Sequence, residues 1–420
     1  MRLIISLSAL LISVLFVQIG SGSLGPLDAL SGLELNFSPT AIGYIGSAHF
    51  MGFFLGCVLS PYIVMRSGHA RAFAVMAAIS AISILLHPVL EEAWFWMVLR
   101  VASGFAVAGA YTVIESWLQS KLNNENRGRV FSIYRMVDMT GTLLSQLIIA
   151  GLTPAHYISY NLIAVVACLA LVPLALTQTT MPALPKDQKF QPFFVFKLSP
   201  LAALGVIVVG LTNSSFRMVA PVYAKQSGLP QSSIAIFLAL GVVGGLVAQL
   251  PAGIIADRIS RRLTLILFSV LSVGACLSIT WQPVDTVAGI PFIYIGGFLF
   301  GFATLPIYSI CASHASDFAK KEDMLALSAS LIFFFALGAV VAPSFAGYLI
   351  DTYGPPALFT FIMTAHIALL LYTLWRYIRR PVTQKQRPYN YMPRTTLYIA
   401  HLARRRKKSA DREKHGVWGR

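Results

Sequence analysis

Long apolar runs separated by short polar connections set the pattern of this chain of 420 residues. We count twelve such runs, with centres near residues 15, 53, 80, 105, 140, 168, 210, 244, 271, 299, 337 and 366. Their length of roughly 18–25 residues is what an α-helix needs to cross a bilayer. They do not alternate between apolar and polar residues, as the strands of a membrane barrel do. The pattern therefore predicts an all-α membrane protein with twelve transmembrane helices.

The domain organisation follows from one polar connector, TQTTMPALPKDQKFQPFF at 177–194, which leaves six predicted helices on either side. The first segment, MRLIISLSALLISVLFVQ, could be a signal peptide, but no A-x-A-like cleavage site follows cleanly, so we favour a first transmembrane helix. We expect an N-terminal six-helix bundle over 1–178, a cytoplasmic connector over 179–197, a C-terminal six-helix bundle over 198–376 and a basic tail over 377–420.

Composition agrees with this class, since 56% of the residues are hydrophobic and 11% are charged. Soluble domains carry about 25% charged residues. The four cysteines fall in different apolar runs and lack the spacing of metal ligands: Cys57, Cys168, Cys276 and Cys311. We expect them to be small buried side chains, with no disulfide framework, metal site or other cofactor.

Loop charges predict the orientation. The connections after the second, fourth, sixth, eighth and tenth helices hold thirteen Lys and Arg residues, whereas the other connections hold only Lys225. Positive charge gathers on the cytoplasmic side, so we expect both termini in the cytoplasm. The segment 376–420 carries 14 basic residues against two acids and explains most of the net charge of +16. This tail is either simply solvated or attracted to anionic lipid headgroups; nothing else in the chain supports nucleic-acid binding.

Two motifs resemble a known family. The stretch GIIADRISRR, residues 253–262, is similar to the cytoplasmic motif G-x-L-x-D-R-x-G-R-R of the major facilitator superfamily, and LRVASG at 99–104 is similar to its helix 4 motif. Wider stretches around residues 115–134 and 305–351 resemble the YcaD-type branch of bacterial inner-membrane members. The resemblance implies the twelve-helix fold of two pseudo-repeated halves, an inner-membrane location and a monomer.

The cytoplasmic motif implies a conformational latch. The residues that would form it are Gly253, Asp257, Arg258, Arg261 and Arg262. Family resemblance implies that Asp257 meets the start of helix 5, after NENRGR, because an acid is stabilised near a helix N-terminus. The earlier copy of the motif, at residues 61–71, has Met65 where the acid belongs. Either Glu322 and Asp323 cap the opposing helix and make that acid redundant, or the motif has drifted.

Charges at membrane depth are costly and by default mark functional sites. We find three acids and three arginines there: Asp28, Glu115, Asp138, Arg100, Arg135 and Arg217. From the depths in the membrane that their positions along the helices imply, we expect Asp28 to pair with Arg100 and Glu115 with Arg135. Asp138 and Arg217 then remain, at intermediate depth and on opposite halves. These pairs are either proton-switching sites or permanent structural ion pairs. His49 either joins the Asp28 group or is a packed histidine.

Polar or small residues recur at helical spacing along five predicted helices, and four of these are the helices that line the central cavity in the resembled superfamily. We therefore add Asn213 and Tyr308 to the candidate substrate and proton cavity. The alternative is that small residues merely allow close helix packing.

The predicted function is secondary active transport of a small organic solute by alternating access, with protons as coupling ion. No ATP-binding signature appears, which argues against primary transport. Helix 5 lacks the Gly-Pro pair of the superfamily's antiporters, which weakens drug/proton antiport. A membrane sensor or assembly partner acting through the tail is the alternative, and an enzyme is disfavoured because no nucleophile–base or metal constellation is evident.

Overall fold

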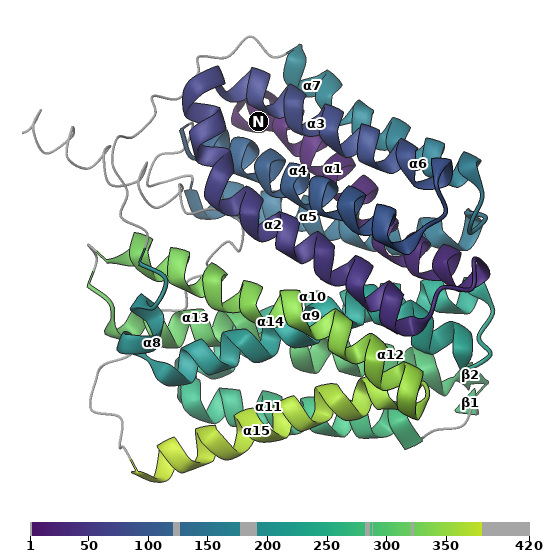
Figure 1. The fold of residues 1–420 in the computed structure, drawn as a ribbon. Coiled ribbons are helices and arrows are strands. Elements are labelled where there is room, and N and C mark those ends of the chain that lie inside the picture. Colours follow the sequence, from purple (N-terminus) through teal and green to yellow (C-terminus); the bar gives the residue numbers. More distant parts are fainter. Residues whose placement is uncertain are drawn as a thin grey trace, which may run out of the picture.

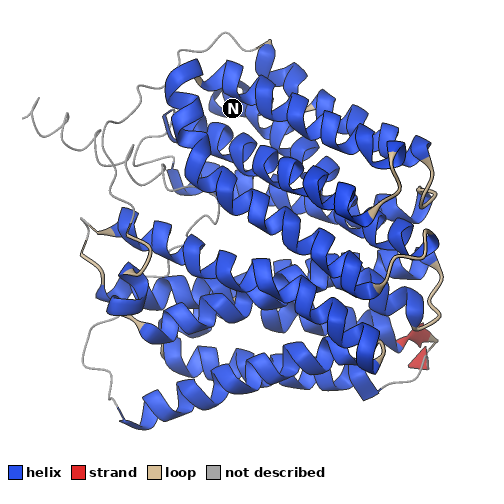
Figure 2. Ribbon diagram, viewed as in Figure 1, coloured by secondary structure: helices blue, strands red, loops and turns tan. Residues whose placement is uncertain are grey.

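A computed structural model describes residues 2–120, 127–176, 191–281, 286–287, 289–320 and 323–379. These residues are almost entirely helical, with one small strand pair, β1 (Thr286–Val287) and β2 (Ile290–Pro291), in a connection (Figure 2). Most of the predicted connector and all of the tail from 380 onward lie outside the described residues.

Two helical halves lie one above the other in Figure 1. The N-terminal half consists of α1 (Arg2–Glu34), α2 (Pro39–Ser67), α3 (His69–Leu86), η1 (His87–Val89), α4 (Ala93–Ser120), α5 (Arg127–Ile148), η2 (Ile149–Gly151), α6 (Tyr157–Leu169) and α7 (Leu171–Ala175). The C-terminal half consists of α8 (Phe194–Leu198), α9 (Pro200–Gln226), α10 (Gln231–Arg258), α11 (Arg261–Trp281), α12 (Phe292–Thr304), α13 (Ile307–Phe318), α14 (Met324–Tyr353) and α15 (Ala357–Arg379).

Eleven stretches of the described residues are long and apolar enough to cross a membrane. Two of them are broken helices, α6 with α7 and α12 with α13. Proline explains both breaks, because Pro173 and Pro306 lack the N–H that would bond four residues back. The twelfth span is α5, whose 22 residues would reach about 33 Å but carry too many polar groups to count as apolar. The twelve-helix prediction is confirmed.

Closely packed glycines reveal the repeat between the halves. A side chain added at Gly52 of α2 or at Gly104 of α4 would collide with the backbone of the other helix, so these two helices cross at close range. Gly244 and Gly301 repeat this relationship between α10 and α12. Small residues at such crossings let helix backbones approach closely in a membrane, where apolar packing against lipid gives no advantage.

The halves touch through α2 against α14, α1 against α9 and α5 against α10. Polar contacts join them near the ends of these helices: Thr40 donates to Asp351 at 2.7 Å, and the backbone N–H of Ser344 donates to Ser47 at 3.0 Å. With the orientation that the loop charges predict, these contacts close the outer side. The halves come together at the right of Figure 1, the end that carries β1 and β2.

Three of the cysteines are buried as expected, and Cys168 is not. It lies on α6, a helix at the rim of the N-terminal half that packs mainly against α1 and α3. The prediction for this residue is wrong because an apolar residue of a membrane helix can face lipid as readily as the protein core.

Candidate functional site

A cavity of about 250 Å³ lies between the two halves. Its polar wall comes from the N-terminal half, with His49 on α2, Tyr111 and Glu115 on α4, and Arg135 and Asp138 on α5. The opposite wall is mainly apolar. It is formed by Leu238 and Val242 of α10, Phe300 of α12, Phe335 of α14, and Leu305 directly after α12. The cavity is therefore amphipathic, with most of its charge on one side.

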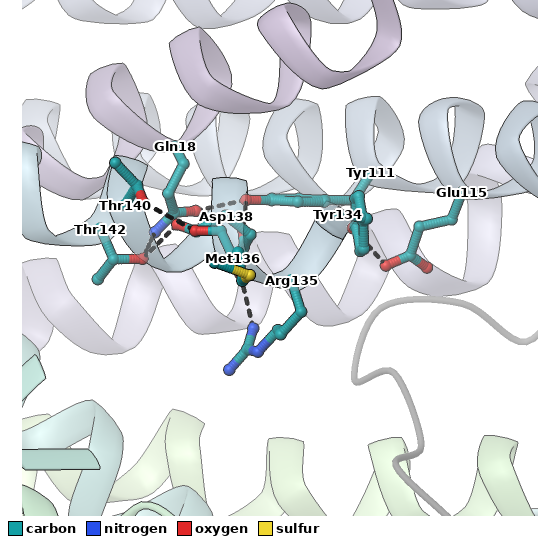
Figure 3. A network of polar contacts seen from close by, with 9 residues as sticks. All are labelled: Gln18, Tyr111, Glu115, Tyr134, Arg135, Met136, Asp138, Thr140 and Thr142. Carbon is teal, nitrogen blue, oxygen red and sulfur yellow. Dashed lines mark hydrogen bonds and ion pairs between the residues drawn. The ribbon is translucent and has the colours of Figure 1, made fainter. Parts of the chain in front are cut away.

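Asp138 is the centre of a polar network in this cavity (Figure 3). Arg135 Nη1 donates to Asp138 Oδ2 at 2.6 Å, and the Tyr111 hydroxyl oxygen lies 2.7 Å from Asp138 Oδ1. The same hydroxyl also reaches Gln18 Oε1, while Gln18 Nε2 lies 2.8 Å from Thr142 Oγ1. Since Tyr111 has a single hydroxyl hydrogen, it can satisfy only one of its two acceptors at a time.

The expected pairing of Glu115 with Arg135 is wrong. Arg135 forms its ion pair with Asp138, three residues along the same helix, and Glu115 accepts a hydrogen bond from the Tyr134 hydroxyl at 2.8 Å. In Figure 3 the carboxylate of Glu115 and the guanidinium of Arg135 point apart. The pairing was expected only from the similar depths of the two residues in the membrane. Residues three apart on one helix share a face, so Arg135 pairs with Asp138 instead.

Arg217 and Asn213 reach the cavity from α9, so Arg217 lies across the halves from Asp138 as expected. Arg217 Nη2 donates to the backbone oxygen of Ser21 on α1 at 3.1 Å. Among the described residues no carboxylate lies within ion-pair distance of Arg217. This arginine therefore differs from the other two intramembrane arginines, each of which is held by an acid.

Asp28 and Arg100 pair as predicted, but away from the cavity. Asp28 Oδ2 lies 3.5 Å from Arg100 Nε and 3.3 Å from His87 Nε2, and the three residues are 2%, 1% and 0% exposed. Neither partner is among the residues that line the cavity. Tyr160 stacks on the His87 ring at a centroid distance of 5.4 Å. Met218 of α9 reaches this cluster from the other half, with its Sδ 3.2 Å from Arg100 Nη2.

His87 was missed by the sequence analysis, although its place at a helix end directly before Pro88 was a signal. We expected His49 either to join the Asp28 group or to be a packed histidine, and neither description fits it completely. It lines the cavity, which Asp28 does not, and its ring meets Phe50 edge to face at 5.3 Å.

Tyr308 does not line the cavity. It is 1% exposed and packs in the core of the C-terminal half, with its ring edge to face with Phe335 at 6.1 Å. The expectation assumed one continuous helix, but the break at Leu305 and Pro306 changes the face that later residues present. The row of polar and small residues along α12 therefore ends before Tyr308.

At the end of α10 the motif residues form an ion cluster within their own half. Arg261 Nη1 lies 3.2 Å from Asp257 Oδ1, and Arg261 Nε donates to Asp317 Oδ2 at 3.0 Å. Arg261 is 2% exposed, whereas Asp257 and Arg258 are exposed at the surface. Asp317, at the end of α13, was not recognised from the sequence; an acid one turn before the basic pair Lys320 and Lys321 was the available signal.

The remaining motif residues also lie near the end of α10. Gly253 is buried within α10, and Arg262, at the start of α11, donates to the backbone oxygen of Arg376 at 3.5 Å. Asp257 was expected to meet the start of helix 5, which is the start of α5, and the side chains at 127–129 there lie outside the described residues, as does Glu322. Asp323 occupies the N-cap position of α14 without a side-chain cap. Its φ of −94° and ψ of −1° are helical, whereas a capping residue typically has extended backbone, so the capping alternative does not hold for Asp323.

Comparison with known proteins agrees with the fold. A family model described as Major Facilitator Superfamily matches residues 10–242 and 202–407. An uncharacterized MFS-type transporter of Enterobacter sp. (strain 638) is 26% identical over 363 residues, covering 86% of this chain and 92% of that protein. The uncharacterized MFS-type transporter YcaD of Salmonella newport (strain SL254) is 25% identical over 370 residues, covering 87% and 94%.

Solved structures show the same architecture. The nucleoside transporter NupG aligns with a TM-score of 0.72 at 14% identity, over 90% of this chain and 99% of that one. A bacterial homolog to the human lysosomal transporter Spinster, inward-facing and unoccupied, gives 0.70 at 13% identity over 96% and 97%. A D-xylose–proton symporter gives 0.67 at 17% identity over 90% and 98%. With its two six-helix halves, its central cavity and a family match over most of its length, the chain belongs to the major facilitator superfamily of secondary transporters.

Proposed function

We propose that this protein moves a small organic solute across the bacterial inner membrane by alternating access, coupled to protons. The observation that carries the proposal is the cavity between the halves, which is lined by α1, α2, α4 and α5 on one side and α9, α10, α12 and α14 on the other. A solute bound there contacts both halves, so its binding can favour one relative position of the halves over another.

The size of the cavity supports a small solute. Ligand pockets commonly have volumes of about 300–1,000 Å³, and this one has about 250 Å³. Polar contacts between the halves, such as Thr40 with Asp351, lie toward the end that we expect to be outside. With that orientation this arrangement would face inward, and the opposite arrangement would require these contacts to break.

Asp28 and Asp138 are the proposed proton carriers. An acid beside an arginine keeps its charge, and loses that support when the arginine is drawn away or the site is dehydrated. Arg100 touches Met218 of the other half, so separation of the halves on the outer side would remove that contact and let water reach Asp28. Protonation of Asp138 would release the Tyr111 hydrogen for Gln18 and so alter contacts among α1, α4 and α5.

The ion cluster of Asp257, Arg261 and Asp317 is the proposed inner latch. Asp317 and Asp257 together hold Arg261 in place, and Asp257 lies at the surface at the end of α10 that we expect to be cytoplasmic. In the outward-facing arrangement Asp257 would meet the start of α5, while the exposed Arg258 would contact the headgroup region.

A thermal-stability screen of the purified protein against small solutes tests the proposal, followed by counterflow of each hit in proteoliposomes. A bound ligand at a hundredfold excess over its Kd stabilises the folded protein by about 2.7 kcal/mol. We expect a hit that accumulates in proteoliposomes and responds to an imposed pH gradient. Binding without counterflow would contradict transport, and counterflow that ignores the pH gradient in both directions would contradict proton coupling alone.

A further inference from the structure

Three buried polar atoms gather where α1 meets α9 at the cavity, and none has a hydrogen-bond partner in the described part of the chain. They are Ser21 Oγ, Asn213 Nδ2 and Arg217 Nε. All three residues line the cavity, and Arg217 is tied to Ser21 through the backbone oxygen of that residue. Each of these atoms can donate a hydrogen bond, and two of them can only donate. The cluster therefore lacks an acceptor.

The charge of the cluster also has no carboxylate in direct contact with it among the described residues. Arg135 and Arg100 are paired with Asp138 and Asp28, respectively, whereas Arg217 has no carboxylate within ion-pair distance among the described residues. A cation at membrane depth is costly unless it is compensated. A guanidinium presents its donors in a planar fork that matches a carboxylate. An anion at this point would satisfy both the donors and the charge.

An apolar surface adjoins the cluster. Phe216, one residue before Arg217, stacks on Phe300 with ring centroids 4.5 Å apart and an interplanar angle of 24°. Both rings line the cavity, together with Leu238 and Val242 of α10. A ligand held by its charged end at Arg217 would thus lay its body against aromatic and aliphatic side chains.

From these observations we infer that the transported solute is an organic monoanion, a carboxylate with an apolar or aromatic body, held by Arg217, Asn213 and Ser21. This inference rests on the proposed function and names its substrate class. A single charge fits better than two, because Glu115 and Asp138 in the opposite wall repel additional negative charge. The site is distinct from the Asp28 and Arg100 cluster, which does not line the cavity.

Matched acid and amide probes test the inference on the purified full-length protein. Benzoate is compared with benzamide, and hexanoate with hexanamide, by thermal unfolding over a range of concentrations. We expect stabilisation by the acids and not by the amides. Arg217→Gln should weaken binding of the acid about tenfold to a hundredfold, as expected for loss of a charge-assisted hydrogen bond. Arg379→Gln removes an exposed positive charge at the end of α15 and should leave binding unchanged.

Asn213→Leu provides a second measurement should Arg217→Gln fail to fold, since it removes a donor without removing charge. It should weaken acid binding several-fold. Equal stabilisation by acid and amide, acid binding that survives both substitutions, or no stabilisation by either acid would each overturn the inference. These outcomes are separate from those of the transport proposal, because counterflow of a neutral solute would uphold transport while contradicting the anion site.

Discussion

The carboxylate of Asp28 and the guanidinium of Arg100 lie 3.5 Å apart in a cluster that is sealed from the cavity, and one side chain of the other half, Met218, touches it. A buried ion pair of this kind is weak support for stability, because removing both charges from water costs about as much as their attraction returns. The pair lies where the two halves meet, next to Met218 of the other half. In the proposed transport cycle, the surroundings of this ion pair would change when the halves separate.

Replacing Asp28 and Asp138 separately should show which acid carries the proton. Asp28→Asn and Asp138→Asn each remove a titratable group while preserving shape, so the variant that lacks the carrier should lose the dependence of transport on the pH gradient. Counterflow, which needs no proton gradient, should persist in that variant. Transport by Asp28→Asn that stays fully pH-dependent would exclude Asp28 as the carrier.

A disulfide across the outer contact should arrest transport. Ser47 and Ser344 lie on α2 and α14, with their hydroxyl oxygens in hydrogen-bond contact, close enough for cysteines at these positions to bridge. We expect Ser47→Cys with Ser344→Cys, in a Cys168→Ser background, to lose transport on oxidation and regain it on reduction. Each single cysteine variant serves as control. Undiminished transport by the fully cross-linked protein would show that this contact does not open.

The glycine crossing of α10 and α12 should tolerate no side chain. An added Cβ at Gly301 would collide with the backbone of Gly241, whereas one at Gly274 on α11 meets nothing within 4 Å. Gly301→Ala should therefore lower the melting temperature markedly or prevent folding. Gly274→Ala should leave it unchanged or raise it, because alanine is favoured over glycine in a helix interior by up to about 1 kcal/mol. Similar melting temperatures for the two variants would refute the tight crossing.

Asp317→Asn should destabilise the C-terminal half. The substitution removes a buried partner of Arg261 and leaves much of that charge uncompensated, which costs on the order of 3 kcal/mol. Thermal unfolding measures the loss, and Glu34→Gln at the exposed end of α1 is the matched control. If both variants unfold at the wild-type temperature, the Arg261–Asp317 pair contributes nothing to holding α11 against α13.

The sequence predicted particular features well where a local rule applied. Run length predicted the helices, and the acid–arginine pair of Asp28 and Arg100 followed from depth on neighbouring helices. The same reasoning failed for Glu115 and Arg135, because depth does not say which face of a helix a residue occupies. It failed for Tyr308 as well, since a proline break changed the helix direction between Phe300 and that residue.

Hydrophobic length and charge placement along the chain thus determined the membrane class, the twelve helices and their division into two halves. These properties depend on each segment's own free energy in the bilayer, which the local sequence sets. Only the tertiary structure decided that Arg100 is sealed behind the cavity while Arg217 faces it, and that His87 joins Asp28. Such relationships depend on how helices far apart in the chain pack and rotate against one another, and that is fixed by contacts between halves that no single segment contains.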